Sequence, residues 1–341
     1  MYHTGVDTHK VHSYFQHMDD DGALGLSMSL PTNAKGIDLF LDKLDAPTTI
    51  TLEAGRNYWW LHEYFANHKN VSDVYVVDPR RSRQIAKELS VISGYGRAKN
   101  DRIDGEMLAD QTRRGLAPTI HVPTAEQLEL RSVCRFRTVT VHHRTQAKNY
   151  IHAVLAMQGK SISIKKLMDE SDAKQKLYDV LPNYVPIIVD HLITRVQLLN
   201  RQIASLDSEL GRLLPASDPQ MKLLLTVPGI GPIMSRIILS EILDIGYFKA
   251  PKYLISYSGL APIDNTSAGR QGPMKLNNFS NHFLKYAFVE AAHNASDNQK
   301  YWKKYELDTS KHGKIIAKLN LARRLAKTVY WMLTRQQPYK L

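Results

Sequence analysis

The order of short apolar segments in the first 80 residues constrains the fold of this chain more than any other feature. Five segments have the apolar or alternating pattern of strands: 2–7, 11–17, 24–30, 48–53 and 74–78. The second and third are joined across Asp19-Asp20-Asp21-Gly22, a tetrapeptide typical of a hairpin turn. Helices are expected at 34–44 and 57–67, and again from about residue 80. The predicted order is therefore β-β-β-α-β-α-β followed by helices.

That order is typical of an RNase H-like domain, a mixed α/β fold, which we place at residues 1–117. Acidic side chains stand where its elements end or begin. Asp7 closes the first strand, Glu53 closes the fourth, and Asp101 and Asp104 open a helix. Any one of them has an ordinary alternative role as a helix cap or a turn residue. Because the ends of such elements can converge, the set as a whole predicts a shared site.

Clustered carboxylates of this kind predict a metal site. Hard oxygen ligands suit Mg²⁺ or Mn²⁺, and two such ions can stabilise the attacking and the leaving oxygen of a phosphodiester. We therefore predict metal-dependent phosphoryl transfer on nucleic acid. The residues predicted to be both catalytic and metal-binding are Asp7, Glu53, Asp101 and Asp104.

Charge is distributed unevenly along the chain, whose 341 residues carry a net charge of +12. Residues 1–120 hold 14 Lys and Arg against 16 Asp and Glu, which leaves 31 against 17 for residues 121–341. A strongly basic half usually binds a polyanion, and much of that affinity comes from counterion release. We expect the second part to bind nucleic acid, while the first is acidic enough to hold metal.

Composition disfavours several other classes of protein. No apolar run approaches the roughly 20 residues that a membrane-spanning helix needs, and the opening Met-Tyr-His-Thr does not have the pattern of a signal segment. A cytoplasmic protein without membrane contact is therefore expected. The one cysteine, Cys134, excludes internal disulfides and multi-cysteine zinc sites, and the 14 histidines show no zinc-like spacing with it.

Long helices are expected in a middle domain at 118–215. Thr124 and Gln127 form a capping-box pattern that opens a helix running to about residue 157. This helix carries many basic and few acidic residues, which favours a polyphosphate-binding face over the alternative of a solvated charged face. The residues expected to contact nucleic acid here are Arg131, Arg135, Arg137, Arg144 and Lys148.

A second helix of the middle domain has an apolar seam that continues for four heptads. Its members recur at alternating spacings of four and three: Val185, Val189, Leu192, Val196, Leu199, Ile203, Leu206, Leu210 and Leu213. We favour a coiled coil that makes or supports a homodimer or tetramer. The alternative is an antiparallel hairpin inside one chain, in which the seam packs on the helix at 124–157. Pro215 ends the second helix and marks a boundary.

The final domain, expected at 216–341 and mainly helical, opens with a glycine-containing turn. Val227-Pro228-Gly229-Ile230-Gly231 stands between two apolar segments in the manner of a helix-hairpin-helix motif, whose backbone N–H groups approach a phosphate. A plain tight turn between packed helices is the alternative. We expect Gly229 and Gly231 to contact nucleic acid.

Further along, Gly259-Leu260-Ala261-Pro262 precedes a polar loop that contains Ser267. With this segment, the chain resembles across nearly its whole length the DEDD-type insertion-sequence transposases, also described as bridge-RNA-guided recombinases, a group that includes some DNA invertases. Members combine a RuvC-like domain bearing Asp, Glu, Asp and Asp with a coiled-coil segment. Their transposase domain has a Val-Pro-Gly-Ile-Gly turn, a Gly-Leu-x-Pro segment and a nucleophilic serine. The four carboxylates named above match the acidic set, and Ser267 matches the serine.

The resemblance implies a reaction. Ser267 would attack a DNA phosphate to form a covalent phosphoserine link, assisted by Mg²⁺ or Mn²⁺ on the four carboxylates. Arg270 and Lys275 would contact neighbouring phosphates. Ser258 and Ser280 are the other candidates for the nucleophile. Because the serine lies far along the chain from the carboxylates, the resemblance implies a site assembled between protomers.

The resemblance also implies nucleic-acid partners in a prokaryotic cytoplasm, close to the nucleoid. A structured noncoding RNA would pair with donor and target DNA, so that base pairing supplies the sequence choice. The surfaces expected to bind that RNA are the basic helix at 124–157 and the C-terminal helix, which carries Lys314, Lys318, Arg323, Arg324 and Lys327.

Three other interpretations stay open. A nuclease or Holliday-junction-type resolvase would use the four carboxylates to activate water and would form no serine adduct. A site-specific DNA invertase would share the covalent step but invert a segment. A non-catalytic nucleic-acid-binding protein would use its RNase H-like domain only as architecture, which the intact acidic set argues against.

Overall fold

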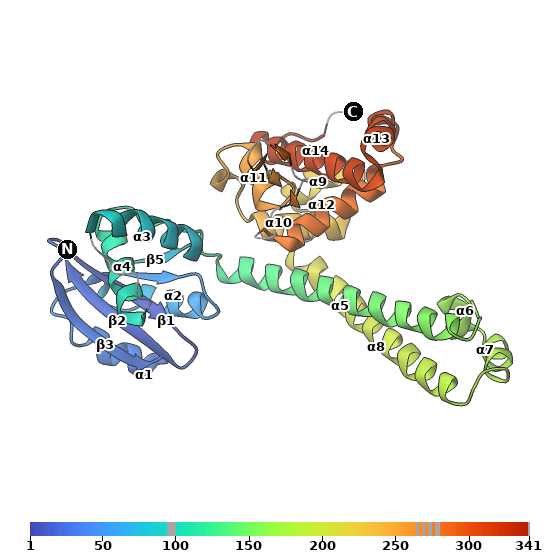
Figure 1. Cartoon of the computed structure of the whole chain (residues 1–341), viewed down its shortest axis with the longest axis horizontal. Coiled ribbons are helices and arrows are strands. Elements are labelled where there is room, and N and C mark those ends of the chain that lie inside the picture. The colour runs from blue at the N-terminus through green and yellow to red at the C-terminus, as the bar shows by residue number, and fades with distance from the viewer. Residues whose placement is uncertain (94–99, 264–265, 268–269, 272–274, 277–279, 340–341) are drawn as a thin grey trace. The chain divides into compact units, whose positions relative to one another are not determined.

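The computed structural model describes residues 1–93, 100–263, 266–267, 270–271, 275–276 and 280–339, with side chains for 1–89, 100–262 and 280–339. The chain divides into two compact units, Met1–Val122 and Pro123–Leu341. The first is mixed α/β and the second is mostly helical (Figure 1). None of the described helices is both long enough and apolar enough to cross a membrane.

One five-stranded sheet forms the centre of the first unit, in the order β3-β2-β1-β4-β5. Its strands are β1 (Tyr2–Thr8), β2 (His12–Asp19), β3 (Leu24–Pro31), β4 (Thr48–Glu53) and β5 (Val71–Val77). The first three pair antiparallel, whereas β4 runs parallel to β1 and β5 runs parallel to β4. Helix α1 (Ala34–Leu41) precedes β4 and α2 (Tyr58–Ala66) precedes β5, so the predicted order of elements is confirmed.

Alternating side chains give the sheet one face that packs on α1 and α2. Phe15 of β2 and Leu52 of β4 are fully buried there, in one cluster with Phe40 of α1 and Phe65 of α2. The rings of Phe15 and Phe40 are stacked, with centroids 4.8 Å apart. Each fully buried side chain of this size contributes roughly 1.5–3 kcal/mol, so this cluster anchors the sheet on its helices.

Helix α4 (Asp101–Arg113), which follows α3 (Pro79–Ser93), packs on β1 and β2. The chain beyond α4 still belongs to the first unit, because it returns to the edge of the sheet. The Ile120 N–H donates to the Val76 carbonyl at 2.8 Å, and the Asp78 N–H donates to the Pro118 carbonyl at 3.0 Å. This pairing explains why the compact unit extends to Val122.

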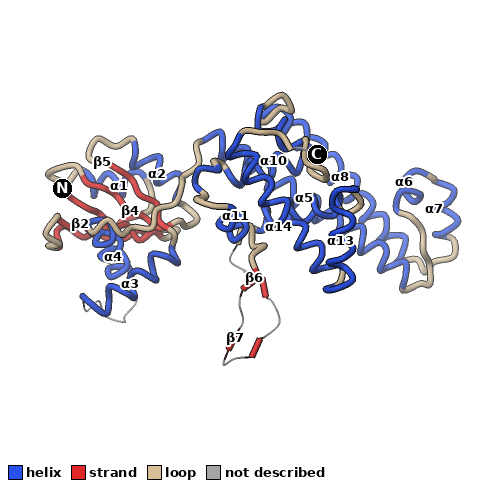
Figure 2. The backbone as a smooth tube through the Cα atoms, turned by 90° about the horizontal axis from the view of Figure 1, so that it is seen from above, coloured by secondary structure: helices blue, strands red, loops and turns tan. Residues whose placement is uncertain are grey.

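Two long helices that pack along each other begin the second unit (Figure 2). They are α5 (Ala125–Ala156) and α8 (Tyr184–Leu213), with α6 (Ile164–Asp169) and α7 (Ser171–Tyr178) between them. Thr124 opens α5 with the predicted capping box. Arg137 of α5 pairs with Asp207 of α8, and Arg144 donates to Asn200. Since the later residue on α5 meets the earlier residue on α8, the two helices are antiparallel.

The apolar seam of α8 faces α5 of the same chain. Val185, Val189 and Val196 are fully buried and form one cluster with Ile151 and Leu155 of α5. This arrangement is the intramolecular hairpin, the alternative considered for the seam. Most of its apolar residues are buried without a second copy, although Leu192, Leu206 and Leu213 are only partly buried. A dimer or tetramer through α8 stays a prediction.

The remaining helices enclose a separate core. They are α9 (Pro219–Leu225), α10 (Pro232–Ile242), α11 (Pro251–Tyr257), α12 (His282–Ala295), α13 (Gln299–His312) and α14 (Lys314–Arg335), with a 3-10 turn at Ile245–Tyr247. Small buried side chains such as Ala291 of α12 and Ala322 of α14 let these helices approach closely. Cys134 of α5 lies in this core, and burial raises the pKa of its thiol to about 11, so the thiol stays protonated near neutral pH.

Candidate metal centre

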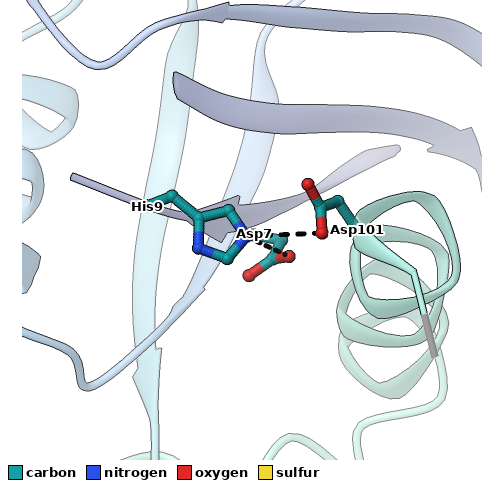
Figure 3. A group of neighbouring side chains, drawn as sticks. All are labelled: Asp7, His9 and Asp101. Carbon is teal, nitrogen blue, oxygen red and sulfur yellow. Dashed lines mark ion pairs between the residues drawn. The ribbon is translucent and has the colours of Figure 1, made fainter. Parts of the chain in front are cut away.

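Asp7, His9 and Asp101 come together at the carboxyl end of β1 (Figure 3). One ligand atom from each residue lies within 4.8 Å of the other two. Nε2 of His9 is 3.3 Å from Oδ2 of Asp7 and 3.4 Å from Oδ1 of Asp101. The Asp7 side chain is 15% exposed, whereas those of His9 and Asp101 are 55% and 61% exposed. The cluster therefore has a largely buried side at β1 and an open side that solvent and substrate can reach.

A close approach of two backbones brings the two aspartates together. Gly5 of β1 lies against Gly105 of α4, and a Cβ added to Gly5 would be 1.9 Å from the Gly105 carbonyl oxygen. From this contact, Asp7 lies two residues along the strand, a rise of roughly 6.6 Å. Asp101 lies four residues back along the helix, a rise of about 6 Å. The two side chains thus reach the same level, and a larger residue at position 5 would keep the helix away.

The other two predicted carboxylates, Glu53 and Asp104, lie on β4 and α4, two elements that contact β1. In the parallel pairing of β1 with β4, the last paired residues directly precede Asp7 and Glu53. Because side chains alternate along a strand, both acids project from the face opposite to the apolar core of α1 and α2. Asp104 is partly buried in the first turn of α4, three residues after Asp101. Neither Glu53 nor Asp104 belongs to the group whose ligand atoms lie within 4.8 Å.

The start of α4 is built to carry negative charge. Asn100 caps the helix, and its side-chain oxygen accepts from the Ile103 N–H at 2.8 Å. Asp101 and Asp104 fill the first turn. Acidic groups there interact favourably with the helix dipole, by roughly 0.3–1 kcal/mol each. Both residues therefore stabilise α4, whatever else they bind.

The donor set fits a divalent ion. Two carboxylates supply the hard oxygen ligands that Mg²⁺ and Mn²⁺ prefer, and an imidazole nitrogen is a common ligand for first-row transition metals. His9 has no role in the sequence prediction, although a signal for it existed. It lies two residues after Asp7 in an extended segment, and residues at that spacing project to the same side.

Two segments of the chain match models of transposase families. Residues 4–158 match a DEDD-type IS110 transposase model, and residues 221–306 match a model described as the transposase IS116/IS110/IS902 family. The first segment contains all four predicted carboxylates, and the second contains the predicted serine. The chain belongs to the DEDD-type insertion-sequence transposases.

Curated relatives of this transposase carry related names. A putative transposase, y4rJ, of Sinorhizobium fredii is 27% identical over 273 residues, which cover 72% of this chain and 65% of that protein. The transposase for insertion sequence element IS1328 of Yersinia enterocolitica is 26% identical over 250 residues, 70% of this chain and 72% of that protein. A pilin gene-inverting protein of Moraxella bovis is 25% identical over 215 residues, which cover 62% of this chain and 56% of that protein. The chain thus spans less than two thirds of the length of the first of these proteins.

The predicted nucleophile of the transposase lies in a segment described only by its backbone. Thr266–Ser267 forms β7 and pairs antiparallel with Arg270–Gln271, which forms β8, so that Ser267 stands opposite Arg270. Lys275 lies in β9 (Lys275–Leu276), paired with β6 (Pro262–Ile263). The side chains of Ser267, Arg270 and Lys275 lie outside the described residues.

The two alternative serines differ in access. Ser258 is fully buried, and its hydroxyl donates to the Leu254 carbonyl at 2.5 Å. A phosphate cannot reach it without an opening of the core. Ser280 is partly exposed just before α12. Of these two, Ser280 is the one that stays a candidate on grounds of access.

Two of the arginines expected to bind nucleic acid contact a buried acid within the second unit. The Glu241 side chain is fully buried, and Arg135 donates to both of its carboxylate oxygens, at 2.7 and 2.8 Å. Arg131 donates to the Ser240 and Glu241 carbonyls, and Asn281 donates to the carboxylate at 2.6 Å. A carboxylate buried in this way needs its partners, since removing one from a buried pair typically costs about 3–5 kcal/mol.

Other predicted contact residues also have partners inside the transposase. Arg137 and Arg144 join α5 to α8, as described above. Arg323 donates to the Leu260 carbonyl at 2.5 Å, and burial lowers the pKa of its guanidinium. Arg324 pairs with Asp308 at 2.7 Å. The structure gives each of these side chains a structural role. For Lys148, partly buried on α5, no ion pair is described.

The glycine turn has two different environments. Gly229 has a positive φ of 86°, and a Cβ there would be 2.3 Å from the Ala291 carbonyl oxygen of α12, so the turn and the packing both require glycine. Gly231 caps α10, and a Cβ there would meet nothing within 4 Å. A depression of about 540 Å³ is lined by the turn together with Asn294 and Asn298. Both glycines line this depression, and only Gly231 has open space where a side chain would stand.

Proposed function

We propose that this transposase breaks and rejoins DNA by metal-assisted phosphoryl transfer, through a covalent link between DNA and Ser267. The observation that carries the proposal is the convergence of Asp7 and Asp101 at the end of β1. Glu53 ends the neighbouring strand β4, and Asp104 lies in the same helix turn as Asp101. An RNase H-like sheet with acids at this edge is suited to bind a divalent ion next to a phosphodiester.

The carboxylates would concentrate negative charge at the end of β1, where a divalent ion can bind. Asp7 and Asp101 would bind the ion directly, and Glu53 and Asp104 would complete or orient its ligands. Mg²⁺ or Mn²⁺ bound there would polarise the phosphate and stabilise the leaving oxygen. Gly5 and the cap of α4 hold the aspartates in place, so that little rearrangement is needed when substrate arrives.

Ser267 supplies the covalent step of the proposal. Its hydroxyl oxygen would form a bond to phosphorus while its proton passes to solvent or a nearby base. The bond between phosphorus and the deoxyribose oxygen breaks, and that oxygen takes up a proton from solvent or a nearby acid. The phosphodiester energy is kept in the serine link, so a second deoxyribose hydroxyl can reverse the step on another strand. Arg270, opposite Ser267 in the β7–β8 pairing, is the residue proposed to contact the phosphate.

Guidance by a structured RNA and assembly as a dimer or tetramer are further parts of the proposal. The uneven charge supports a polyanion on the second unit, since residues 121–341 hold 31 basic against 17 acidic side chains. Lys148, Gly229, Gly231, Lys275 and the basic C-terminal helix are the proposed contacts. The arginines with internal partners would contribute chiefly by holding these surfaces in shape.

A second candidate outcome is inversion of a DNA segment. It is favoured by the similarity to the pilin gene-inverting proteins of Moraxella bovis and Moraxella lacunata, each 25% identical over 215 residues. Inversion and insertion share the same breaking and joining chemistry. They differ in whether the two recombining sites lie on one DNA molecule.

Detection of a protein–DNA adduct tests the proposal. The protein, with any RNA that co-purifies, is incubated with element-junction DNA and Mg²⁺ and analysed on a denaturing gel, beside Ser267→Ala and Ser280→Ala variants. We expect an adduct with wild type and Ser280→Ala, none with Ser267→Ala, and none in EDTA. Metal-dependent cutting without any adduct would instead favour the resolvase or nuclease mechanism.

A further inference from the structure

His9 lies at the metal centre, in one group with the two aspartates. Its Nε2 is nearly equidistant from one oxygen of Asp7 and one of Asp101, at 3.3 and 3.4 Å. Both distances exceed the 2.7–3.2 Å of a good N–H···O bond, and the two contacts are ion pairs only when the imidazole is protonated. The spacing instead resembles that of neighbouring ligands around one ion, roughly 3 Å apart when each bond is about 2.1 Å.

The backbone of His9 is held in place by its surroundings. Its N–H donates to the His12 carbonyl at 3.2 Å, across the turn between β1 and β2. Its carbonyl accepts from Oγ1 of Thr32 at 2.9 Å and from Nδ2 of Asn57 at 3.4 Å. These contacts come from three separate segments of the first unit. They hold the His9 backbone beside the aspartates, while its side chain is 55% exposed.

We propose that Nε2 of His9 is a direct ligand of the divalent ion, and that this nitrogen makes the centre prefer Mn²⁺ and later first-row ions over Mg²⁺. The inference rests on the proposed function only in placing an ion between Asp7 and Asp101. Mg²⁺ favours oxygen ligands and gains little from an imidazole, whereas affinity for nitrogen-containing sites rises from Mn²⁺ along the first row. His9 thus sets which metal the carboxylates hold.

Pulsed EPR of Mn²⁺ bound to the full-length protein tests the ligand directly. A nitrogen bonded to Mn²⁺ gives a ¹⁴N coupling, and ¹⁵N-histidine labelling assigns that coupling to an imidazole. The test variant is His9→Ala. The matched control is His12→Ala, an exposed histidine on the same turn. Calorimetric titrations with Mn²⁺ and with Mg²⁺ give the two affinities of each protein.

We expect the histidine coupling in wild type and in His12→Ala, and its loss in His9→Ala. Mn²⁺ affinity should fall by about tenfold or more in His9→Ala, and Mg²⁺ affinity by a smaller factor. If Mn²⁺ binds wild type without a nitrogen coupling and Asp101→Asn abolishes that binding, the ligand proposal is overturned while the carboxylate centre stands. If Asp7→Asn and Asp101→Asn bind Mn²⁺ as wild type does, the ion lies elsewhere and both proposals fail.

Discussion

Gly5 shows how one residue without a side chain positions residues that have one. The strand β1 and the helix α4 approach until the Gly5 backbone touches that of Gly105, and this contact places Asp101 beside Asp7. Neither aspartate is unusual in its own element, since one ends a strand and the other begins a helix. Their proximity depends on the distance between the two elements, and Gly5 sets that distance.

Replacing Gly5 by alanine should therefore disturb both the fold and the site. The added Cβ would lie 1.9 Å from the Gly105 carbonyl oxygen, so α4 must move away. We expect the stability of the first unit to fall by about 2–3 kcal/mol or more, together with its Mn²⁺ affinity. Hydrogen exchange of the β1 and β4 amides measures the first effect, and calorimetry measures the second.

Gly55→Ala is the matched control in the same unit. A Cβ at Gly55 would have its nearest contact at 3.7 Å, an ordinary van der Waals distance. We expect this variant to exchange and to bind metal as wild type does. Equal loss in the two variants would mean that glycine matters at both positions for the flexibility of the chain rather than for the approach of α4.

At the scale of elements, the apolar seam of α8 could pack either on α5 of the same chain or on a helix of a second copy. A four-heptad apolar seam predicts that another helix covers it, and the helix inside the same chain does so. The ion pair between Arg137 and Asp207 and the hydrogen bond from Arg144 to Asn200 fix the antiparallel direction. Basic residues that the sequence suggests for nucleic-acid binding are thus engaged in contacts between the two helices.

A charge placed in this seam should separate the two helices. Val196 is fully buried, and Val196→Asp would place an unpaired carboxylate among apolar side chains. We expect the free energy of unfolding of the helical pair to fall by about 3 kcal/mol or more. Urea unfolding monitored by circular dichroism measures this loss. Leu198→Asp is the control, because Leu198 is 47% exposed and lies on the same helix. Its effect should stay within about 0.5 kcal/mol.

The same two variants also test whether α8 makes a dimer or tetramer. Light scattering measures the molar mass of each variant in solution. If Val196→Asp halves the mass and leaves unfolding unchanged, the seam faces a second copy and the intramolecular packing is contradicted. If Leu198→Asp alone halves the mass, the exposed face of α8 is the one that associates.

At the scale of the whole molecule, the proposed interaction with nucleic acid depends on how charge is divided between the two units. The first unit carries slightly more acidic than basic residues, so all of the excess positive charge lies in the second. Several arginines of the second unit have internal partners, so its formal charge overstates the number of side chains ready to meet phosphates. The salt dependence of the binding constant reports how many side chains contact phosphates.

We expect DNA or RNA affinity to fall steeply with rising salt, and single variants to change the slope by different amounts. Lys148→Gln should reduce the slope of log K against log salt by about 1, as loss of one phosphate contact does. Arg137→Gln should leave the slope unchanged, because its guanidinium pairs with Asp207, and should instead destabilise the helical pair. Fluorescence anisotropy at several salt concentrations measures both. Equal slope changes would show that the Arg137 pair opens on binding.

Local patterns in the sequence determined the elements and the residues able to do chemistry. Alternation with period two predicted the five strands, the capping box predicted the start of α5, and the four carboxylates were identified at element ends. Tertiary structure alone decided which of them meet, that His9 joins Asp7 and Asp101, and that α5 covers the seam. It also decided that Arg135 pairs with Glu241, 106 residues away. The physical reason is range: propensity and periodicity act over a few residues, whereas a close approach such as that of Gly5 and Gly105 depends on packing between elements distant in the chain.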